Sequence, residues 1–316
     1  MSTDYKIVAL AGGVGGAKMA DGLAQVLQPE QLTIIGNTGD DFIHLGLRIS
    51  PDLDTICYTL AGFANPDTGW GRQNETWNVM NGLKQMGMPD WFQIGDSDLA
   101  THITRTTRFN AGWTLDRITR EFCHIWGILV KVLPMSNDEV HTLVITEDGE
   151  LEFQEYFVHR KCVPVVKGFK FIGANDSLPA PGVLDAIRDS DVVVICPSNP
   201  LVSIDPILSI PGIQHALKDH YIIAVSPIIG NQTVKGPAAK MFSELGIQPS
   251  ALAVAQHYRK LIDLLVIDTI DELMSNSINN IGIETHITNI LMKDRPDRGR
   301  LAKEIIGLLD RRPKVN

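Results

Sequence analysis

The sequence has little cysteine, and its few cysteines are not spaced like a metal site or a redox motif. The 316 residues include Cys57, Cys123, Cys162 and Cys196, with no CxxC pair among them. Three of the four stand in apolar runs, which favours buried free thiols over disulfides or zinc ligands. This pattern predicts a reducing, cytoplasmic setting.

Long apolar runs and an excess of basic residues are also missing. No apolar run approaches the roughly 20 residues that cross a bilayer, and the first residues lack the basic-then-apolar pattern of a signal peptide. The formal net charge is −9, which disfavours nonspecific nucleic-acid binding and points to a small-molecule partner. No Gly-x-Ser-x-Gly motif occurs, so acyl transfer by a serine nucleophile is set aside.

Short apolar runs, in contrast, recur along the whole chain. Most of them are followed by segments compatible with a helix, and they lie at 6–10, 32–35, 128–133, 192–196, 221–225 and 264–267. This alternation predicts one α/β domain over 1–316, with a Rossmann-like, doubly wound, mainly parallel sheet. Ligands of such sheets bind at the carboxyl ends of the strands, so the polar loops that follow the runs are expected to converge.

Two segments depart from the alternation. Residues 50–127 show helical periodicity at 75–86, 99–107 and 115–126, which predicts a helical insertion on one side of the sheet. Residues 140–158 alternate apolar and polar side chains about a Glu-Asp-Gly-Glu turn, which predicts a peripheral β-hairpin.

The first strand-like run leads into a glycine-rich motif, YKIVALAGGVGGAK at 5–18. Glycine lets backbone amides approach an anion, and a helix expected at 19–27 would turn its positive end to the same point. The motif lacks the Gly-Lys-Ser/Thr of a Walker A loop, and Lys18 stands where a dinucleotide fingerprint has glycine or alanine. Phosphate or diphosphate binding is therefore favoured over a merely tight strand-to-helix turn.

Two pairs of aspartates follow the second run. Asp40 and Asp41 indicate either a metal or substrate-hydroxyl site or a solvated Asx turn. Asp52 and Asp54 are expected on one side of a short extended or turn segment, where Asp54 or Ser50 could instead cap the next helix. Four carboxylates within 15 residues repel one another unless a cation neutralises them, which favours magnesium.

Three later loops carry polar groups that could bind a ligand. Asp96 and Asp98 open a helix that carries His102, although a lone helical histidine is more often structural. The segment 198–200, Ser-Asn-Pro, follows a very apolar run and could read a base or sugar edge or form a plain proline-bounded turn. The loop from 227 to 236, with Lys235 and Gly236, likewise follows an apolar run and carries polar groups. Together the last two loops suggest a nucleotide pocket.

Taken in order, six motifs resemble one family. They are AGGVGGAK (11–18), NTGDD (37–41), SPDLDT (50–55), GDSDLATH (95–102), CPSNPLVSIDPIL (196–208) and SPIIGNQTVKGPAAKM (226–241). The chain resembles, from about 5 to 310, the 2-phospho-L-lactate transferase family (CofD or FbiA) of deazaflavin coenzyme F-420 biosynthesis. The resemblance implies that the terminal hydroxyl of the deazaflavin FO attacks the phosphorus of a GDP-linked three-carbon acid and releases GMP. The acid could be phospholactate, phosphoenolpyruvate or phosphoglycerate.

The resemblance also implies roles for single residues. The diphosphate would be held by Gly12, Gly13, Gly15, Gly16 and Lys18. The guanosine would be surrounded by Ser198, Asn199, Pro200, Ser203, Asp205, Gly230, Lys235 and Gly236. The FO side would consist of Asp54, Asp96, Ser97, Asp98 and His102, with Asp54 and Asp52 as catalytic residues. Magnesium would be bound by Asp54, Asp40 and Asp41.

Position 97 departs from the family pattern, because a residue that is often basic there is serine in this chain. Arg105 or Arg108 could replace its contact with phosphate or FO. The resemblance further implies a homodimer. Asp54 is expected on a surface loop, so its replacement by asparagine should abolish transfer and leave the fold intact. The alternative is a YvcK-like regulatory protein that binds nucleotide sugars without transferase activity, since such proteins open on a similar glycine motif.

Overall fold

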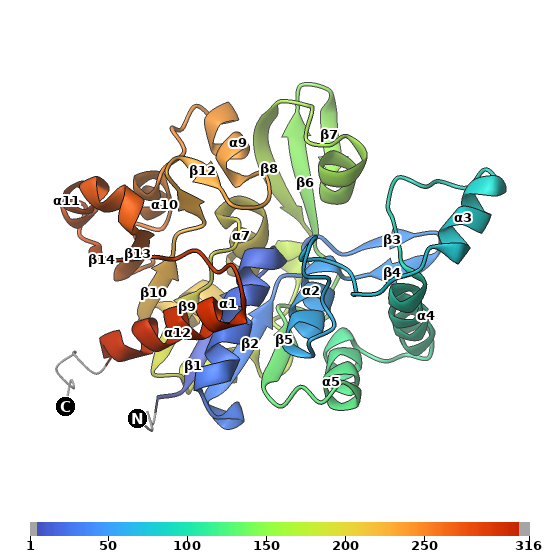
Figure 1. The fold of residues 1–316 in the computed structure, drawn as a ribbon, viewed down its shortest axis with the longest axis horizontal. Helices are drawn as coiled ribbons and strands as arrows, with labels where there is room; N and C mark the ends of the chain where they lie inside the picture. The colour runs from blue at the N-terminus through green and yellow to red at the C-terminus, as the bar shows by residue number, and fades with distance from the viewer. Residues whose placement is uncertain (1–4, 310–316) are drawn as a thin grey trace.

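A computed structural model describes residues 5–309 and has a seven-stranded parallel sheet at its centre (Figure 1). In spatial order its strands are β14 (Glu284–Thr288), β13 (Leu264–Asp268), β10 (Tyr221–Val225), β9 (Val192–Ile195), β1 (Ile7–Ala11), β2 (Leu32–Gly36) and β5 (Lys131–Pro134). The inner strands are buried along nearly their whole length, as expected for a parallel sheet covered on both faces. The predicted α/β class is confirmed. The sequence reading missed β14, a polar edge strand of sequence ETHIT.

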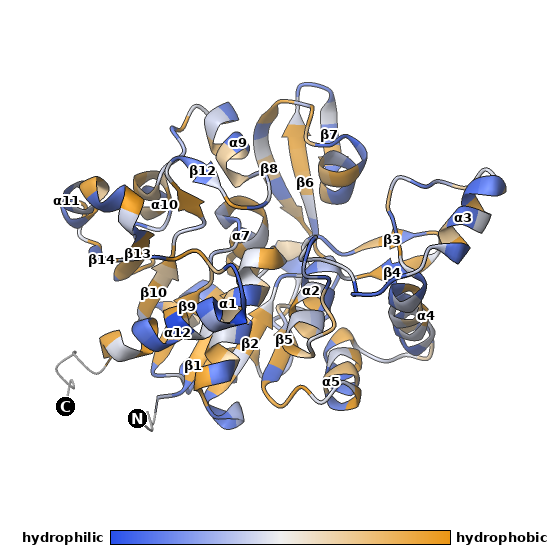
Figure 2. Cartoon of the chain, viewed as in Figure 1, coloured by the Kyte–Doolittle hydropathy of each residue, from blue (hydrophilic) through white to orange (hydrophobic). Residues whose placement is uncertain are grey.

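Helices cover both faces of the sheet and bury a separate apolar core on each. One layer contains α1 (Gly13–Val26), α2 (Pro51–Leu60), α5 (Leu115–Ile125) and α12 (Arg295–Leu309). The other contains α6 (Val183–Arg188), α7 (Asp205–Ser209), α8 (Ile213–Leu217), α9 (Ala238–Glu244), α10 (Ala251–His257) and α11 (Ser275–Asn279). Figure 2 shows apolar strands inside and more polar outer helices. Cys57, Cys123 and Cys196 are buried free thiols, as predicted, whereas Cys162 is partly exposed.

The order of the strands reverses between β1 and β9. From β1 the chain continues to β2 and β5 on one side, and from β9 it continues to β10, β13 and β14 on the other. This is the switch point at which doubly wound sheets bind ligands, because the loops after the two central strands diverge there. The glycine motif follows β1, and the loop that begins at Pro197 follows β9.

A smaller group of elements projects from the sheet. The hairpin of β3 (Phe42–His44) and β4 (Leu47–Ile49) joins α3 (Asn78–Gln85) and α4 (Asp96–Asn110) around a small core of its own. In Figure 1 these elements extend away from the central sheet. Of the four helices in the segment 50–127, therefore, α3 and α4 belong to the projecting part, whereas α2 packs on α1 in the main layer.

An antiparallel sheet lies beside the main one. Strands β6 (His141–Thr146) and β7 (Gly149–Glu152) form the hairpin, and β8 (Val166–Ile172) adds a third strand that the sequence reading missed. The chain leaves β7 through a π-helical turn, Glu155–His159. A further short pair consists of β11 (Ile228–Ile229) and β12 (Gln232–Thr233). Within 5–309, no helix is long and apolar enough to cross a membrane.

Candidate functional site

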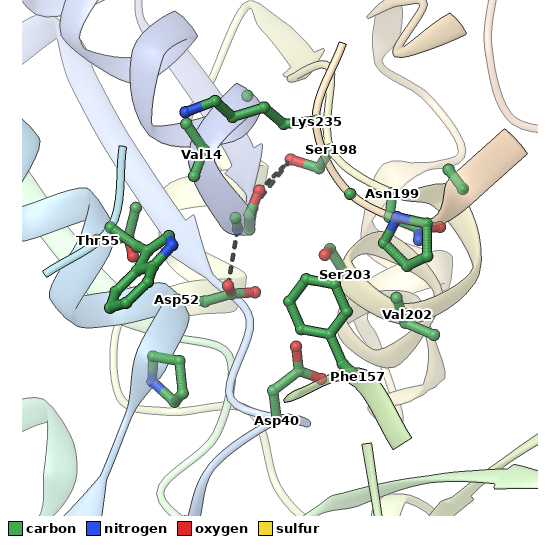
Figure 3. Close-up of a pocket in the computed structure, with 18 of the residues that line it drawn as sticks. Val14, Asp40, Asp52, Thr55, Phe157, Ser198, Asn199, Val202, Ser203 and Lys235 are labelled. Carbon is green, nitrogen blue, oxygen red and sulfur yellow. Dashed lines mark hydrogen bonds between the residues drawn. The ribbon is translucent and has the colours of Figure 1, made fainter. Parts of the chain in front are cut away.

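A cavity of about 550 Å³ opens at the carboxyl ends of the central strands, at the switch point (Figure 3). It gathers loops that lie far apart in the sequence. Many of the residues that the sequence predicted for a site line this cavity. They are Gly12, Gly13, Gly15, Lys18, Asp40, Asp52, Asp54, Asp98, His102, Ser198, Asn199, Ser203, Lys235 and Gly236. The loops expected to converge are therefore neighbours around one cavity.

The glycine motif is the first turn of a helix rather than a loop before one. The helix expected at 19–27 begins at Gly13, and Gly12 is its extended N-cap. The amide of Gly12 donates to Ser198 Oγ (3.0 Å), and the amide of Gly13 donates to Asp52 Oδ1 (2.8 Å). A Cβ on Gly12 would lie 2.5 Å from Asp52 Oδ2. Glycine is thus needed for the close approach of protein side chains, and two of the amides expected to hold phosphate are engaged within the protein.

Asp52 lies at the positive end of α1, where an anion is favoured. The prediction that it stands on a short extended or turn segment is wrong: it belongs to the first turn of α2, whose N-cap is Ser50. Asn37 Nδ2 donates to its Oδ2 (2.9 Å), while Gly13 donates to its Oδ1. Burial raises the pKa of Asp52 to about 6, although the hydrogen bonds from Asn37 and Gly13 oppose the shift. A buried carboxylate therefore fixes the ends of three elements to one another.

Asp54 is also on α2, and it is buried rather than on a surface loop as expected. Its Oδ1 accepts a hydrogen bond from Arg105 Nη2 of α4, and Arg105 is itself only 3% exposed. Burial raises the pKa of Asp54, whereas the charge of Arg105 opposes the shift. Oδ2 of Asp54 is buried and has no hydrogen-bond partner among the described residues. Arg108 lies one turn further along α4 and pairs with Glu121 instead.

His102 stands between two carboxylates. Its Nδ1 lies 3.7 Å from Asp54 Oδ2, and its Nε2 lies 3.4 Å from Asp98 Oδ1. Tyr58 donates to the same Asp98 oxygen (2.6 Å). Burial works against the charged form of Asp98, but the contacts from His102, Tyr58 and Arg105 outweigh it and lower the pKa. His102 also lines the cavity, although a lone helical histidine is more often structural.

Asp40 and Asp41 are held by an Asx turn, but they are not solvated. The amide of Gly39 donates to Asn37 Oδ1 (2.8 Å), which forms the turn, and Ser50 Oγ donates to Asp41 Oδ2 (2.6 Å). Burial raises the pKa of both carboxyls well above the usual range, and for Asp40 the charges of Asp52 and Asp41 add to the shift. Asp40 lines the cavity, whereas Asp41 does not.

These carboxylates suit a hard cation only in part. Three buried carboxylate oxygens have no hydrogen-bond partner within the described chain: Asp40 Oδ1, Asp41 Oδ1 and Asp54 Oδ2. Among residues 5–309, however, no group of three or more acidic, histidine or cysteine side chains is placed to hold a metal ion. Magnesium in proteins often takes one or two carboxylates and completes its shell with water and substrate phosphates. The cavity fits that mode and does not offer an all-protein cage.

Two lysines face the cavity from other elements. Lys18 Nζ on α1 donates to the carbonyl of Met292 (2.9 Å), and Lys235 Nζ donates to the carbonyls of Asp67 (3.1 Å) and Thr68 (2.6 Å). Burial and the charges of nearby cations lower the pKa of Lys18. Because their partners are neutral carbonyls, both ammonium groups keep a net positive charge for an anionic ligand.

The loop after β9 is partly used for its own structure. Ser198 Oγ also donates to the carbonyl of Gly12 (2.8 Å), and Asn199 Oδ1 caps a π-helical turn, Pro200–Ile204, by accepting from Leu201 N (3.1 Å). Ser203 follows in this turn and reaches the cavity, whereas Pro200 does not.

Several predicted residues lie outside the cavity. Asp205 opens α7 and pairs with His257 (2.9 Å). Asp96 caps α3 by accepting from Thr76 Oγ1 and from the amides of residues 78 and 79. The remaining ones that do not line it are Gly16, Ser97 and Gly230. Gly16 is packed against Ser198, since a Cβ there would lie 2.5 Å from its Oγ.

Sequence reasoning missed the aromatic part of the cavity. Its lining includes Tyr58, Trp70, Phe92, Phe153 and Phe157. In Figure 3 the ring of Phe157 points into the cavity near Ser203 and Asp40. These residues come from four separate segments, and none belongs to a recognisable motif. The loop at 290–292, which follows the missed strand β14, also lines the cavity.

Comparison with known proteins shows the family to which the chain is similar. A family model described as 2-phospho-L-lactate transferase CofD matches residues 7–290. The phosphoenolpyruvate transferase of Streptomyces griseus is 41% identical over 313 residues, covering 96% of this chain and 98% of that protein. The phosphoenolpyruvate transferase of Thermobifida fusca is 42% identical over 306 residues, with 93% and 94% covered.

An archaeal relative and a solved structure extend the comparison. The 2-phospho-L-lactate transferase of Methanococcoides burtonii is 36% identical over 302 residues, covering 96% of this chain and 99% of that protein. The crystal structure of a UPF0052 family protein from Bacillus halodurans has a TM-score of 0.63 at 16% identity, with 96% of this chain and 99% of that chain covered. The likeness to the Bacillus halodurans protein concerns the fold alone.

Proposed function

The chain belongs to the 2-phospho-L-lactate transferase CofD family, and on that premise we propose that it transfers a phospho-three-carbon acid from a GDP-linked donor to FO. The terminal hydroxyl oxygen of FO bonds to the phosphorus that carries the acid. The bond from that phosphorus to the GMP oxygen breaks, GMP leaves with the electron pair, the hydroxyl proton passes to Asp54 or to water, and a phosphodiester remains. This is a step in the biosynthesis of coenzyme F-420.

The observation that carries the proposal is the meeting of opposite charges in one cavity at the switch point. Lys18 and Lys235 face the cavity as cations, whereas Asp54 offers a carboxylate oxygen without a partner in the described chain. A diphosphate between the lysines would be held by charge-assisted hydrogen bonds. Asp54 Oδ2 would accept a hydrogen bond from the attacking hydroxyl and orient it. Phosphoryl transfer asks the protein mainly for such positioning and charge stabilisation.

Magnesium is part of the proposal. Asp40 is the first candidate ligand, because it lines the cavity and its Oδ1 is buried without a partner in the described chain. Asp54 could contribute, whereas Asp41 does not line the cavity and accepts a hydrogen bond from Ser50. The ion would supply charge neutralisation for the donor's phosphates and for the crowded carboxylates.

Enolpyruvate is the first candidate for the three-carbon acid. The actinobacterial relatives named phosphoenolpyruvate transferases are 41% and 42% identical to this chain, against 36% for the archaeal 2-phospho-L-lactate transferase. The proposed order of donor preference is therefore phosphoenolpyruvate, then phospholactate or phosphoglycerate.

A direct assay tests the transfer. FO is incubated with each of the three GDP-linked donors, with magnesium and with a chelator, and the product mass and GMP are measured. We expect a product of FO plus the phospho-acid with magnesium, formed fastest from the enolpyruvate donor, and a large loss of rate with the chelator. Absence of product and GMP with every donor would refute the proposed function. Equal rates with the chelator would refute the magnesium requirement alone.

Two further proposals are a homodimer, which the resemblance supports, and a cytoplasmic setting, which the free cysteines support. The hairpin of β6 and β7 or the strands near the carboxyl end of the chain could supply the interface. Light scattering of the purified chain tests this, since the monomer has a mass of 34.8 kDa and a dimer would have about twice that mass.

A further inference from the structure

A buried arginine contacts Asp54 from outside the lining of the cavity, and the proposed reaction gives it no role. Arg105 of α4 contacts three groups: it donates to Asp54 Oδ1 and to the carbonyl of Arg48 (3.2 Å), and its Nη1 lies 3.1 Å from His102 Nδ1. It does not line the cavity, so it cannot replace a substrate contact of position 97 as the sequence suggested. Its position behind the wall indicates a different role.

The contact with His102 fixes the position of that histidine's proton. A guanidinium has only donors and stays protonated, so His102 Nδ1 must be the acceptor in the 3.1 Å contact. The distance of 3.7 Å from Nδ1 to Asp54 Oδ2 is too long for a competing hydrogen bond. A neutral imidazole that accepts at Nδ1 carries its proton on Nε2. That proton then points toward Asp98 Oδ1 at 3.4 Å, and Nε2 is buried without a hydrogen-bond partner among the described residues.

With this tautomer, every donor in the network around Asp54 and Asp98 is turned toward an acceptor. Tyr58 donates to Asp98, His102 Nε2 is turned to the same carboxylate, and Arg105 donates to both His102 and Asp54. Asp54 Oδ1 is occupied in this way. Oδ2 is left as the one acceptor of that carboxylate without a hydrogen bond in the described chain.

We propose that Arg105 is a positioning residue for the transfer: it holds the carboxylate of Asp54 with Oδ2 free for the acceptor hydroxyl, and it keeps His102 as an Nε2 hydrogen-bond donor at the cavity wall. The inference rests on the proposed function for the role of Asp54, but the tautomer of His102 does not depend on it. Both effects need the planar fork of arginine, because a lysine ammonium is a single point that cannot bridge the two groups in the same way.

The first test reads the tautomer without any substrate. The imidazole nitrogens of histidine are labelled with ¹⁵N, and the His102 signals are assigned by their loss in His102→Gln. In long-range ¹H–¹⁵N spectra we expect the Nε2–H tautomer for the wild type and a changed tautomer population for Arg105→Lys. A wild-type His102 protonated on Nδ1, or an identical tautomer in Arg105→Lys, would overturn the proposal.

The second test separates positioning from substrate binding. For Arg105→Lys we expect kcat to fall by about 100-fold, as for a misplaced reacting group, while the KM for the GDP-linked donor changes by less than about threefold. Arg108→Lys is the matched control, since Arg108 lies on the same helix and pairs with Glu121 away from the cavity. It should keep both parameters. A rise in donor KM with unchanged kcat for Arg105→Lys would contradict positioning.

Folding of the variant is checked by circular dichroism. If Arg105→Lys does not fold, the double variant Arg105→Gln and Asp54→Asn removes both buried charges together and carries the same tautomer test. If the wild type makes no product but shows the Nε2–H tautomer, the proposed function fails and the structural part of this inference stands.

Discussion

The two charged walls of the cavity are built in different ways. The carboxylate wall consists of Asp40, Asp52, Asp54 and Asp98, of which the first three are buried and Asp98 is partly exposed. Asp52 is bonded to Asn37 and the start of α1, while Asp54 is bonded to Arg105.

The lysine wall consists of Lys18 and Lys235, and among residues 5–309 its two ammonium groups donate only to main-chain carbonyls of loops. A carbonyl contact is neutral and exchangeable, whereas a buried ion pair is expensive to break. The comparison indicates that the carboxylates are fixed before substrate binds and that the lysines are free to exchange their partners for phosphate.

The largest expected effect comes from breaking the carboxylate wall at Asp54. In Asp54→Asn the charge that orients the hydroxyl is gone, so we expect kcat to fall by about 1,000-fold. Because Arg105 then lacks its partner, unfolding free energy should also fall by about 3 kcal/mol, in contrast to the intact fold expected from a surface loop. Turnover and urea unfolding measure the two effects. Turnover near the wild-type level would remove Asp54 from the mechanism.

Substitutions in the lysine wall should weaken binding of the donor and leave the stability of the fold nearly unchanged. In Lys18→Met and Lys235→Met we expect the donor KM to rise by about 10- to 100-fold, the value of one charged hydrogen bond, with little change in melting temperature. Lys240→Met is the control, since Lys240 pairs with Glu244 on α9 and does not line the cavity. An unchanged donor KM in both variants would place the diphosphate elsewhere.

Within the carboxylate wall, Asp52 should make stability depend on pH. Its pKa is about 6 in the folded chain and near 3.8 in the unfolded chain, so the folded state holds more protons between these values. The contribution of Asp52 therefore destabilises the fold above about pH 6, and this penalty disappears as the pH falls toward 4.

The matched variant Asp52→Asn isolates this contribution. Without magnesium it should be more stable than the wild type at pH 7.5, by on the order of 2 kcal/mol, and similar to it near pH 4. Urea unfolding at both pH values measures the difference. If the variant is less stable than the wild type by the same amount at both pH values, the hydrogen bonds of Asp52 stabilise the fold by more than its buried charge destabilises it.

The smallest effect is expected at Asp96, which the sequence placed beside FO. Hydrogen bonds, above all from Thr76, lower its pKa to about 2, and it caps α3 instead of facing the cavity. In Asp96→Asn transfer should stay within about twofold of the wild type, because exposed positions away from a site change little. A large rise in the KM for FO in this variant would instead support the predicted contact of Asp96 with FO.

Much of the fold could be read from local patterns. The six apolar runs became six of the seven strands of the parallel sheet, because buried parallel strands need continuous apolar residues. β14 was missed because an edge strand can carry polar residues, as ETHIT does. The start of α1 was missed because glycine is a poor helix former, and tertiary contacts with Asp52 and Ser198 override that propensity here.

The candidate site was only partly predictable. Motifs singled out Asp40 and Asp54, because clustered acidic residues stand out in a polar segment, whereas His102 was placed at the site only by the family resemblance. They could not separate Asp96, which caps a neighbouring helix, from Asp98, which lines the cavity two residues later. They also could not find Phe157, because an aromatic residue after a hairpin has no distinguishing spacing.

The sequence by itself determined the α/β class, the family and the loops that meet at the switch point, because these follow from hydrophobic periodicity and from motifs in a fixed order. Only the tertiary structure decided what each polar group contacts. Gly13 donates to Asp52, and Arg105 holds Asp54 beside His102, across separations of 39 and 51 residues. Partners so far apart in the chain are selected by packing, and packing determines which charges are buried and which remain for a ligand.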